Sequence, residues 1–185
     1  MLKSLEKNPN FTPRRGPLVL AILDGVGFGK YADGDAVKMA NIPVFNSLLA
    51  NSPSTKLKAH GTAVGMPSDA DMGNSEVGHN AIGSGRVFAQ GAKLVEDAIT
   101  SKKLFAGDSW LKLVNNVKSH NSTLHFIGLL SDGNVHSNIS HLKAMITEAR
   151  LAGVKKIRVH ALLDGRDVPE TSALEYIVPL SLIHI

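Results

Sequence analysis

The chain has 185 residues, of which 43% are hydrophobic and 19% charged, a composition typical of globular proteins with a buried core. It has no cysteine, which excludes disulfides and thiolate metal ligands. Its 20 basic and 16 acidic residues leave a formal charge of +4. No basic stripe is interleaved with aromatic residues, so this surplus favours a solvated surface, or attraction of an anionic substrate, over a nucleic-acid partner.

The N-terminus lacks the apolar core of a secretory signal, and no run approaches the roughly 18 apolar residues of a membrane helix. We therefore expect a cytoplasmic protein without a membrane partner.

The predicted elements alternate between strands and helices. Short apolar runs predict strands at residues 17–24, 55–60, 123–130 and 156–163. Helical patterns cover residues 41–51, 75–82, 91–101, 109–119 and 137–151, the last ended by Gly153. The strand, helix, strand order from residue 123 to residue 163 is a βαβ unit, so we predict an α/β fold with a parallel sheet.

Polar, glycine-containing clusters follow three of these strands. They begin at Asp24, at Ser131 and at Asp164. Because ligands of α/β sheets bind beyond the carboxyl ends of the strands, these clusters are candidate site segments.

Asp24 opens the first cluster, Asp24-Gly25-Val26-Gly27-Phe28-Gly29. The GxGxG spacing is a poor match to a phosphate loop, and a carboxylate at its mouth repels phosphate. A carboxylate at a strand end is instead a suitable ligand for a divalent cation. An ordinary Asp-Gly turn explains the same residues equally well.

Ser75 lies in the polar segment Asp69–Asn80, at the predicted start of a helix. A serine there is most often an N-cap. The same position places its hydroxyl at the positive end of the helix dipole, where a nearby metal ion would make it a nucleophile able to accept a phosphoryl group.

His136, Arg166 and Asp167 are the remaining candidates from the residues alone. A single histidine is more often structural than functional, and a turn with Asp164, Arg166 and Asp167 is commonly a weak surface salt bridge. The functional alternative is that arginine binds a carboxylate or phosphate while an aspartate acts as general base toward a substrate hydroxyl.

Four segments together resemble a known family. LDGVG, GTAVGMPSDADMGNSEVGHNAIGSGRV, LLSDGNVHS and VHALLDGRDVP are similar to the cofactor-independent phosphoglycerate mutases of the alkaline phosphatase superfamily. The resemblance spans residues 18–177 and is strongest to the plant and trypanosomatid branch. It implies an enzyme that interconverts 2-phosphoglycerate and 3-phosphoglycerate through a phosphoserine, with two manganese or other divalent ions.

The resemblance also implies a division into domains and a role for each candidate. Residues 1–87 would begin a parallel-sheet, phosphatase-like domain, and residues 88–177 an α/β substrate domain inserted into it, both partial. Asp24 and Ser75 match metal ligands, and Ser75 also matches the phosphoryl acceptor. His136, Arg166 and Asp167 match residues that bind the glycerate, with Asp167 as its acid or base. The whole enzyme is expected to be a monomer.

Residues 178–185 do not match the family's continuation, and we expect Pro179 to break a helix there. A truncated gene model or a frameshift would explain this segment, so His184 is not a ligand candidate. Since family members are more than twice as long and their other metal ligands lie downstream, we expect no mutase activity and weak or no metal binding from these 185 residues alone. The alternatives are another phosphomutase or phosphatase of the superfamily, and a non-catalytic α/β protein that binds or regulates the full-length enzyme.

Overall fold

The computed structural model describes residue 4 and residues 6–183, and divides the chain into two units, residues 1–54 and residues 55–185. The positions of the units relative to one another are not determined. His184 lies outside the described residues.

The first unit contains two short helices, α1 (Ala36–Met39) and α2 (Pro43–Asn51). Asp35 caps α1, since its carboxylate accepts hydrogen bonds from the backbone of Val37 and Lys38. The N-cap of α2 is Ile42, with Pro43 in the first turn where its missing N–H costs nothing. Neither helix has a buried residue.

The prediction of a strand at residues 17–24 is wrong. The segment has no regular secondary structure, and its side chains are exposed, with Leu18 at 96% and Leu20 at 66% exposure. A parallel strand is stable only when a neighbour satisfies its backbone and both faces are covered, and no described residue pairs with this one. The strand predicted at residues 55–60 is absent among the described residues for the same reason.

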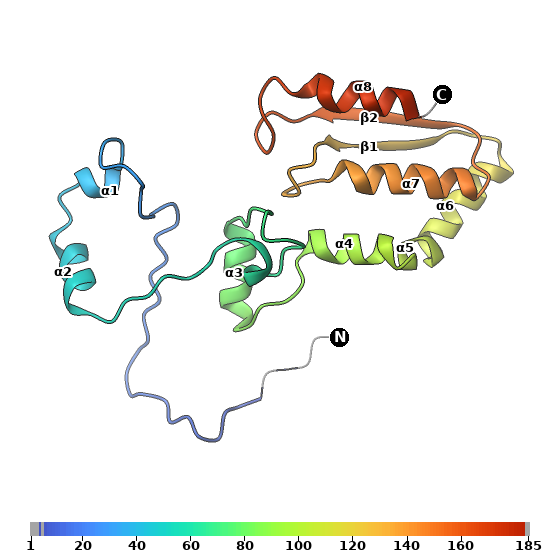
Figure 1. Ribbon diagram of the computed structural model, residues 1–185. Helices are drawn as coiled ribbons and strands as arrows, with labels where there is room; N and C mark the ends of the chain where they lie inside the picture. The colour runs from blue at the N-terminus through green and yellow to red at the C-terminus, as the bar shows by residue number, and fades with distance from the viewer. Residues whose placement is uncertain (1–3, 5, 184–185) are drawn as a thin grey trace. The chain divides into compact units, whose positions relative to one another are not determined.

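The second unit holds the remaining elements, in the order seen in Figure 1. They are η1 (Gly61–Val64), α3 (Ser75–Ser84), α4 (Gly91–Thr100), α5 (Lys103–Ala106), α6 (Asp108–Ser119), β1 (Leu124–Leu130), α7 (Ile139–Leu151), β2 (Ile157–Leu163) and α8 (Ala173–Ile183). The two strands and the helices predicted between residues 75 and 151 are confirmed within a few residues.

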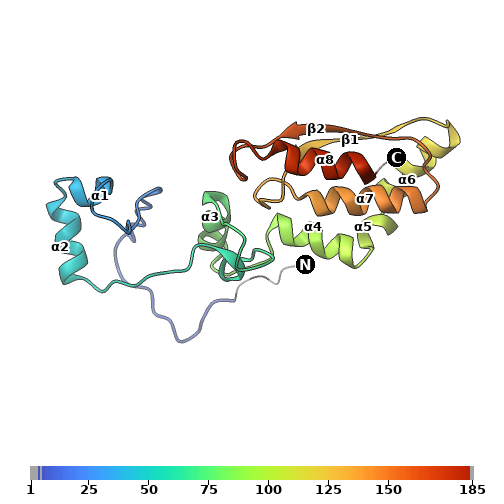
Figure 2. The same cartoon turned by 45° about the horizontal axis from the view of Figure 1, so that its top comes forward.

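The centre of this unit is the βαβ unit β1–α7–β2. The strands pair in parallel, with Leu124 opposite Ile157 and Leu130 opposite Leu163, as the sequence predicts. In Figure 2, α7 and α8 lie on the same side of the sheet. Leu130, Ile146 of α7 and Leu180 of α8 form the core on that side. The alternate residues of the strands point to the other side of the sheet, where the apolar side chains of Ile127 and Leu162 are exposed.

Helix α8 corrects the expectation that Pro179 breaks a helix. The helix continues through Pro179 to Ile183. Proline removes one backbone donor from a helix interior, but Leu180, directly after it, is buried in the core against α7. This tertiary packing outweighs the local preference. Among the residues that the structure describes, no helix is both long and apolar enough to cross a membrane.

Candidate functional site

Ser75 is the first residue of α3, and the structure corrects the interpretation of this serine as a helix cap. Asn74 is the N-cap, and its side chain accepts a hydrogen bond from the backbone of Val77 at 3.0 Å. Ser75 is exposed in the first turn, where the helix dipole places partial positive charge. Capping therefore does not account for this serine.

The loop between β1 and α7 carries His136. Its backbone is held by Ser131, whose buried hydroxyl accepts from Gly133 N–H at 3.1 Å, and by Ser137, whose hydroxyl donates to the carbonyl of Leu129 at 2.6 Å. Asn138 closes the loop by capping α7. His136 itself is exposed, so the loop presents it to solvent rather than to the core.

Asp164 organises the loop after β2, which carries Arg166 and Asp167. One of its oxygens accepts backbone hydrogen bonds from Gly165, Arg166 and Asp167 at 2.7, 3.0 and 3.2 Å. A hydrogen bond from the Ser131 hydroxyl, together with these backbone donors, lowers the pKa of Asp164 to about 2. The salt bridges among the described residues do not include Arg166, so the interpretation of this turn as an ion-paired surface loop is wrong. Arg166 is exposed and Asp167 is half-buried.

The loops after the two strands pack directly against each other. A Cβ built on Gly133 would lie 2.6 Å from the Cβ of Asp167 and 2.9 Å from its carbonyl oxygen. Only glycine permits this approach. The contact places the segment of His136 next to that of Arg166 and Asp167, as expected for neighbouring parallel strands.

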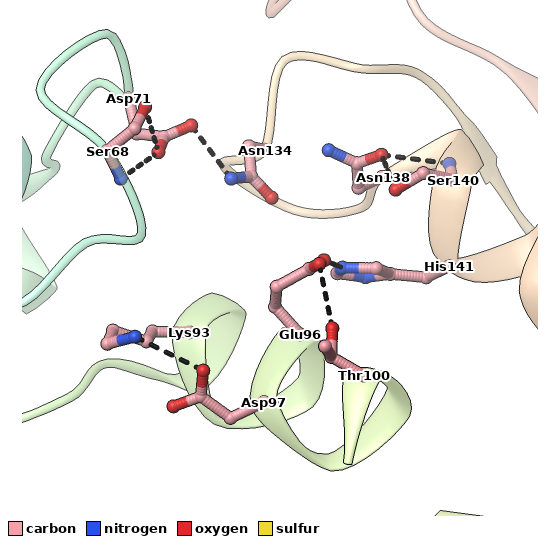
Figure 3. A network of polar contacts seen from close by, with 10 residues as sticks. All are labelled: Ser68, Asp71, Lys93, Glu96, Asp97, Thr100, Asn134, Asn138, Ser140 and His141. Atoms are coloured by element: carbon pink, nitrogen blue, oxygen red, sulfur yellow. Dashed lines mark hydrogen bonds and ion pairs between the residues drawn. The ribbon is translucent and has the colours of Figure 1, made fainter. Parts of the chain in front are cut away.

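The segment of Ser75 meets the loop of His136 as well. Residues on both sides of Ser75, Asn74 and Glu76, line a cavity of about 140 Å³ together with Asn134 and Val135. Figure 3 shows the polar contact beside it, in which the Asn134 amide donates to the Asp71 carboxylate at 2.7 Å. His136 lines a second, mostly apolar cavity of about 470 Å³ between β1, α4 and α7. One wall of that region is fixed by the contact of His141 with Glu96, also drawn in Figure 3.

Asp24 belongs to the first unit, whereas Ser75 belongs to the second. It lies in a turn closed by a hydrogen bond from Val26 N–H to the carbonyl of Leu23, with Gly25 at φ 83°, so the Asp-Gly turn is present. No group of three or more His, Asp or Glu side chains suited to a metal ion occurs within the described part of the chain. A hard divalent ion takes about six ligands, so the described residues do not fit a metal site by themselves.

Sequence reasoning misses the residues that hold these segments in place. It treats Asp164 only as a charged member of a turn, and it assigns no role to Ser131, Asp71 or Asn134. The position of Asp164, directly after a strand and before three loop residues, is typical of a carboxylate that accepts from its own loop. No comparable signal exists for Asp71 and Asn134, which are 63 residues apart.

Comparison with known proteins places these segments in a family. Residues 95–183 match the family model described as the BPG-independent PGAM N-terminus. The chain is 52% identical over 177 residues to a probable 2,3-bisphosphoglycerate-independent phosphoglycerate mutase of Leptospira interrogans, covering 95% of this chain and 32% of that protein. It is 50% identical to the Trypanosoma brucei brucei enzyme of the same name, with 89% and 30% covered, and 46% identical to that of Zea mays, with 91% and 30% covered.

A solved structure agrees with the sequence relatives. The chain is similar to a crystal structure of Leishmania mexicana phosphoglycerate mutase at low cobalt concentration, with a TM-score of 0.79 and 49% identity over 87% of this chain and 30% of that one. The chain thus spans about a third of the length of these relatives. Both groups that the motifs indicate, plants and trypanosomatids, are among them. The family match includes residues 178–183, within the segment expected to be atypical. The chain belongs to the family of 2,3-bisphosphoglycerate-independent phosphoglycerate mutases.

Proposed function

We propose that this chain supplies the phosphoryl acceptor and part of the glycerate site of an enzyme that interconverts 2-phosphoglycerate and 3-phosphoglycerate. The observation that carries the proposal is the meeting of three segments in one unit. Asn74 and Glu76, which flank Ser75, line one cavity with Asn134 and Val135, and the loop with Asp167 packs against Gly133. Both the nucleophile and the groups that hold a small anionic substrate are needed at one place for phosphoryl transfer.

The proposed reaction uses these residues in two steps. The Ser75 hydroxyl loses its proton to solvent as its oxygen attacks phosphorus, the bond from phosphorus to the glycerate oxygen breaks, and that oxygen takes up a proton from the Asp167 carboxyl group. The glycerate then reorients while His136 and Arg166 hold it. Its other hydroxyl gives a proton to the Asp167 carboxylate and attacks the phosphoserine, the bond from phosphorus to the serine oxygen breaks, and the serine oxygen takes back a proton from solvent. The exposed Arg166 guanidinium is suited to a carboxylate or phosphate because its planar N–H groups pair with two oxygens.

Manganese, or another divalent ion, is part of the proposal for the whole enzyme. Asp24 and Ser75 are proposed as two of its ligands. Two oxygen donors do not make a site, and no step above depends on one. The inserted arrangement of a second domain, a cytoplasmic location and a monomeric state also stay predictions. No observation favours another phosphomutase or a non-catalytic regulator.

The test is a chimera in which this chain replaces the matching third of the Leishmania mexicana enzyme, assayed for conversion of 3-phosphoglycerate to 2-phosphoglycerate. We expect activity in the chimera, and a loss of at least about a thousandfold in kcat/KM after Ser75→Ala. The control is Ser109→Ala, because Ser109 is also an exposed serine in the first turn of a helix, α6. Equal activity of the two variants would contradict the assignment of Ser75.

A further inference from the structure

We infer that Asp71 and Asn134 are positioning residues. They form a reversible polar contact that holds the segment carrying Ser75 against the loop carrying His136. Asp71 lies four residues before Ser75 and Asn134 two residues before His136. The contact between them is a hydrogen bond of 2.7 Å from the Asn134 amide to one carboxylate oxygen of Asp71, and both residues are half-buried. Its catalytic meaning rests on the proposed function, whereas its existence as a structural contact does not.

Asp71 is held rigidly at its end of the contact. Its second carboxylate oxygen accepts from the backbone N–H of Ser68 at 2.7 Å and from the Ser68 hydroxyl at 2.8 Å. Its carbonyl accepts from Gly61 N–H at 3.0 Å. Partial burial opposes ionisation, but the hydrogen bonds from Asn134 and Ser68 outweigh it and lower the pKa of Asp71. The residue is therefore a charged, preorganised acceptor at neutral pH.

Asn134 is held in an unusual conformation at the other end. Its φ is +60°, in the left-handed region that few residues other than glycine and asparagine occupy. Its N–H donates to the carbonyl of Ser137 at 3.2 Å, which keeps the loop folded around His136. Glycine would satisfy this backbone as well as asparagine does. The side-chain amide, which glycine lacks, is used for Asp71.

The contact is suited to open and close. A permanent joint between two segments is usually made of buried apolar side chains, whereas a single hydrogen bond between half-buried groups exchanges readily with bonds to water. The two ends of the segment that contains Ser75 are joined separately, because Gln90 N–H donates a hydrogen bond to the carbonyl of Gly65 at 2.9 Å. The Asp71–Asn134 contact then sets how closely the start of α3 approaches the His136 loop.

The experiment measures the distance between α3 and α7 in the 185-residue chain by double electron–electron resonance. The chain has no cysteine, so Asn80→Cys and Thr147→Cys, both exposed, give a unique pair of spin labels. A second pair, Lys112→Cys with Thr147→Cys, reports the α6–α7 packing, whose core contains Val114, Val117 and Ala149. Four backgrounds are compared: unchanged, Asn134→Gly, Asn134→Asp, and Asp71→Asn combined with Asn134→Asp.

We expect one narrow α3–α7 distance in the unchanged chain. In both Asn134→Gly and Asn134→Asp, the ratio of separated to closed forms rises about tenfold or more. Asn134→Gly removes the donor of the hydrogen bond, and Asn134→Asp places a second carboxylate opposite Asp71. The double variant restores the narrow distance, because it exchanges donor and acceptor. The amide introduced at position 71 donates to the carboxylate introduced at position 134, and its oxygen still accepts from Ser68.

Two controls accompany these variants. The α6–α7 distance stays constant throughout, because the Asp71–Asn134 contact takes no part in that packing. Asn121→Gly is the matched substitution, since Asn121 also has positive φ, at 48°, and its change should leave the α3–α7 distance as it is.

An unchanged α3–α7 distance in Asn134→Gly, or no restoration in the double variant, would overturn the inference. If Asn134→Asp also disturbs the α6–α7 pair, Asn134→Gly decides, because it preserves the backbone conformation. None of these measurements uses substrate, so their failure leaves the proposed function standing, and failure of the Ser75→Ala assay leaves the contact standing.

Discussion

The two units of this chain have similar local signals and different outcomes. Residues 17–24 and residues 124–130 are both short apolar runs with an aspartate-glycine pair at or just after their end, yet only the second run becomes a strand. Leu124 of β1 is 3% exposed, whereas Leu20 is 66% exposed. The difference is the presence of a partner: β2 pairs along the whole of β1 within the same unit, and no described residue pairs with residues 17–24. Apolar composition specifies a buried strand only where the tertiary structure provides a neighbour.

The largest expected effect contrasts these two leucines. Leu124→Ala should lower the free energy of unfolding by about 2 to 5 kcal/mol, because it leaves a cavity among Val114, Val117 and Ala149. Leu20→Ala should change it by less than about 0.5 kcal/mol. Urea denaturation followed by circular dichroism measures both. Equal losses would mean that residues 17–24 are packed as tightly as β1.

Two glycines with positive φ provide the next contrast. Gly65 has φ 87°, and a Cβ there would lie 1.9 Å from the carbonyl oxygen of Phe88, whereas Gly25 has φ 83° and open space around it. Gly65→Ala should destabilise the second unit by about 2 kcal/mol or more, from the left-handed backbone and the clash together. Gly25→Ala should leave the unfolding of the second unit unchanged. A mild effect of Gly65→Ala in the same denaturation assay would show that residues 85–90 are not fixed to Gly65.

The pH dependence of stability should distinguish Asp164, which interacts with Ser131 of another loop, from Asp35, which caps the short helix α1. The pKa of Asp164 is lowered to about 2 from its ordinary value of 3.8, so the stability that it contributes is complete above pH 3.8 and is lost as the pH falls toward 2. Asp164→Asn should therefore unfold more easily than the unchanged chain at neutral pH, and the difference should vanish near pH 2. The pKa of Asp35 is lowered by its cap of α1, chiefly through the backbone of Lys38. Asp35→Asn should leave the cooperative unfolding transition unchanged at every pH.

The smallest effect is expected for exposed ion pairs. Lys93 and Asp97 lie 3.2 Å apart, one turn from each other on α4, where Asp97 is exposed and Lys93 is half-buried. Lys93→Ala should cost less than about 0.5 kcal/mol, as usual for surface pairs at this spacing. Thermal denaturation at low and high salt measures it. A salt-sensitive loss well above this value would indicate that α4 is held by charge rather than by the burial of Ile99.

Most of the second unit was predictable because its signals are local. The apolar runs of β1 and β2, the polar start of α3 and the glycine after α7 each act within a few residues. Ser75, His136, Arg166 and Asp167 are likewise candidates because of their place at element ends, and their roles stay predictions. The capping role of Asn74 instead of Ser75 was missed, because either residue satisfies the same helix terminus.

The contacts that join these segments were beyond sequence reasoning. Gly133 against Asp167, Asn134 with Asp71, and Tyr176 donating to Asp132 at 2.7 Å each connect residues distant in the chain. Pro179 inside α8 is a further case, since packing of Leu180 decides against the local rule.

The sequence by itself determined the family, the βαβ unit and the identity of the candidate site residues, because motifs and periodicity are written in neighbouring positions. The tertiary structure alone decided which apolar runs become strands and which loops meet. Strand pairing and loop packing depend on hydrogen bonds and van der Waals contacts between distant residues, and their free energy exists only once those residues are brought together.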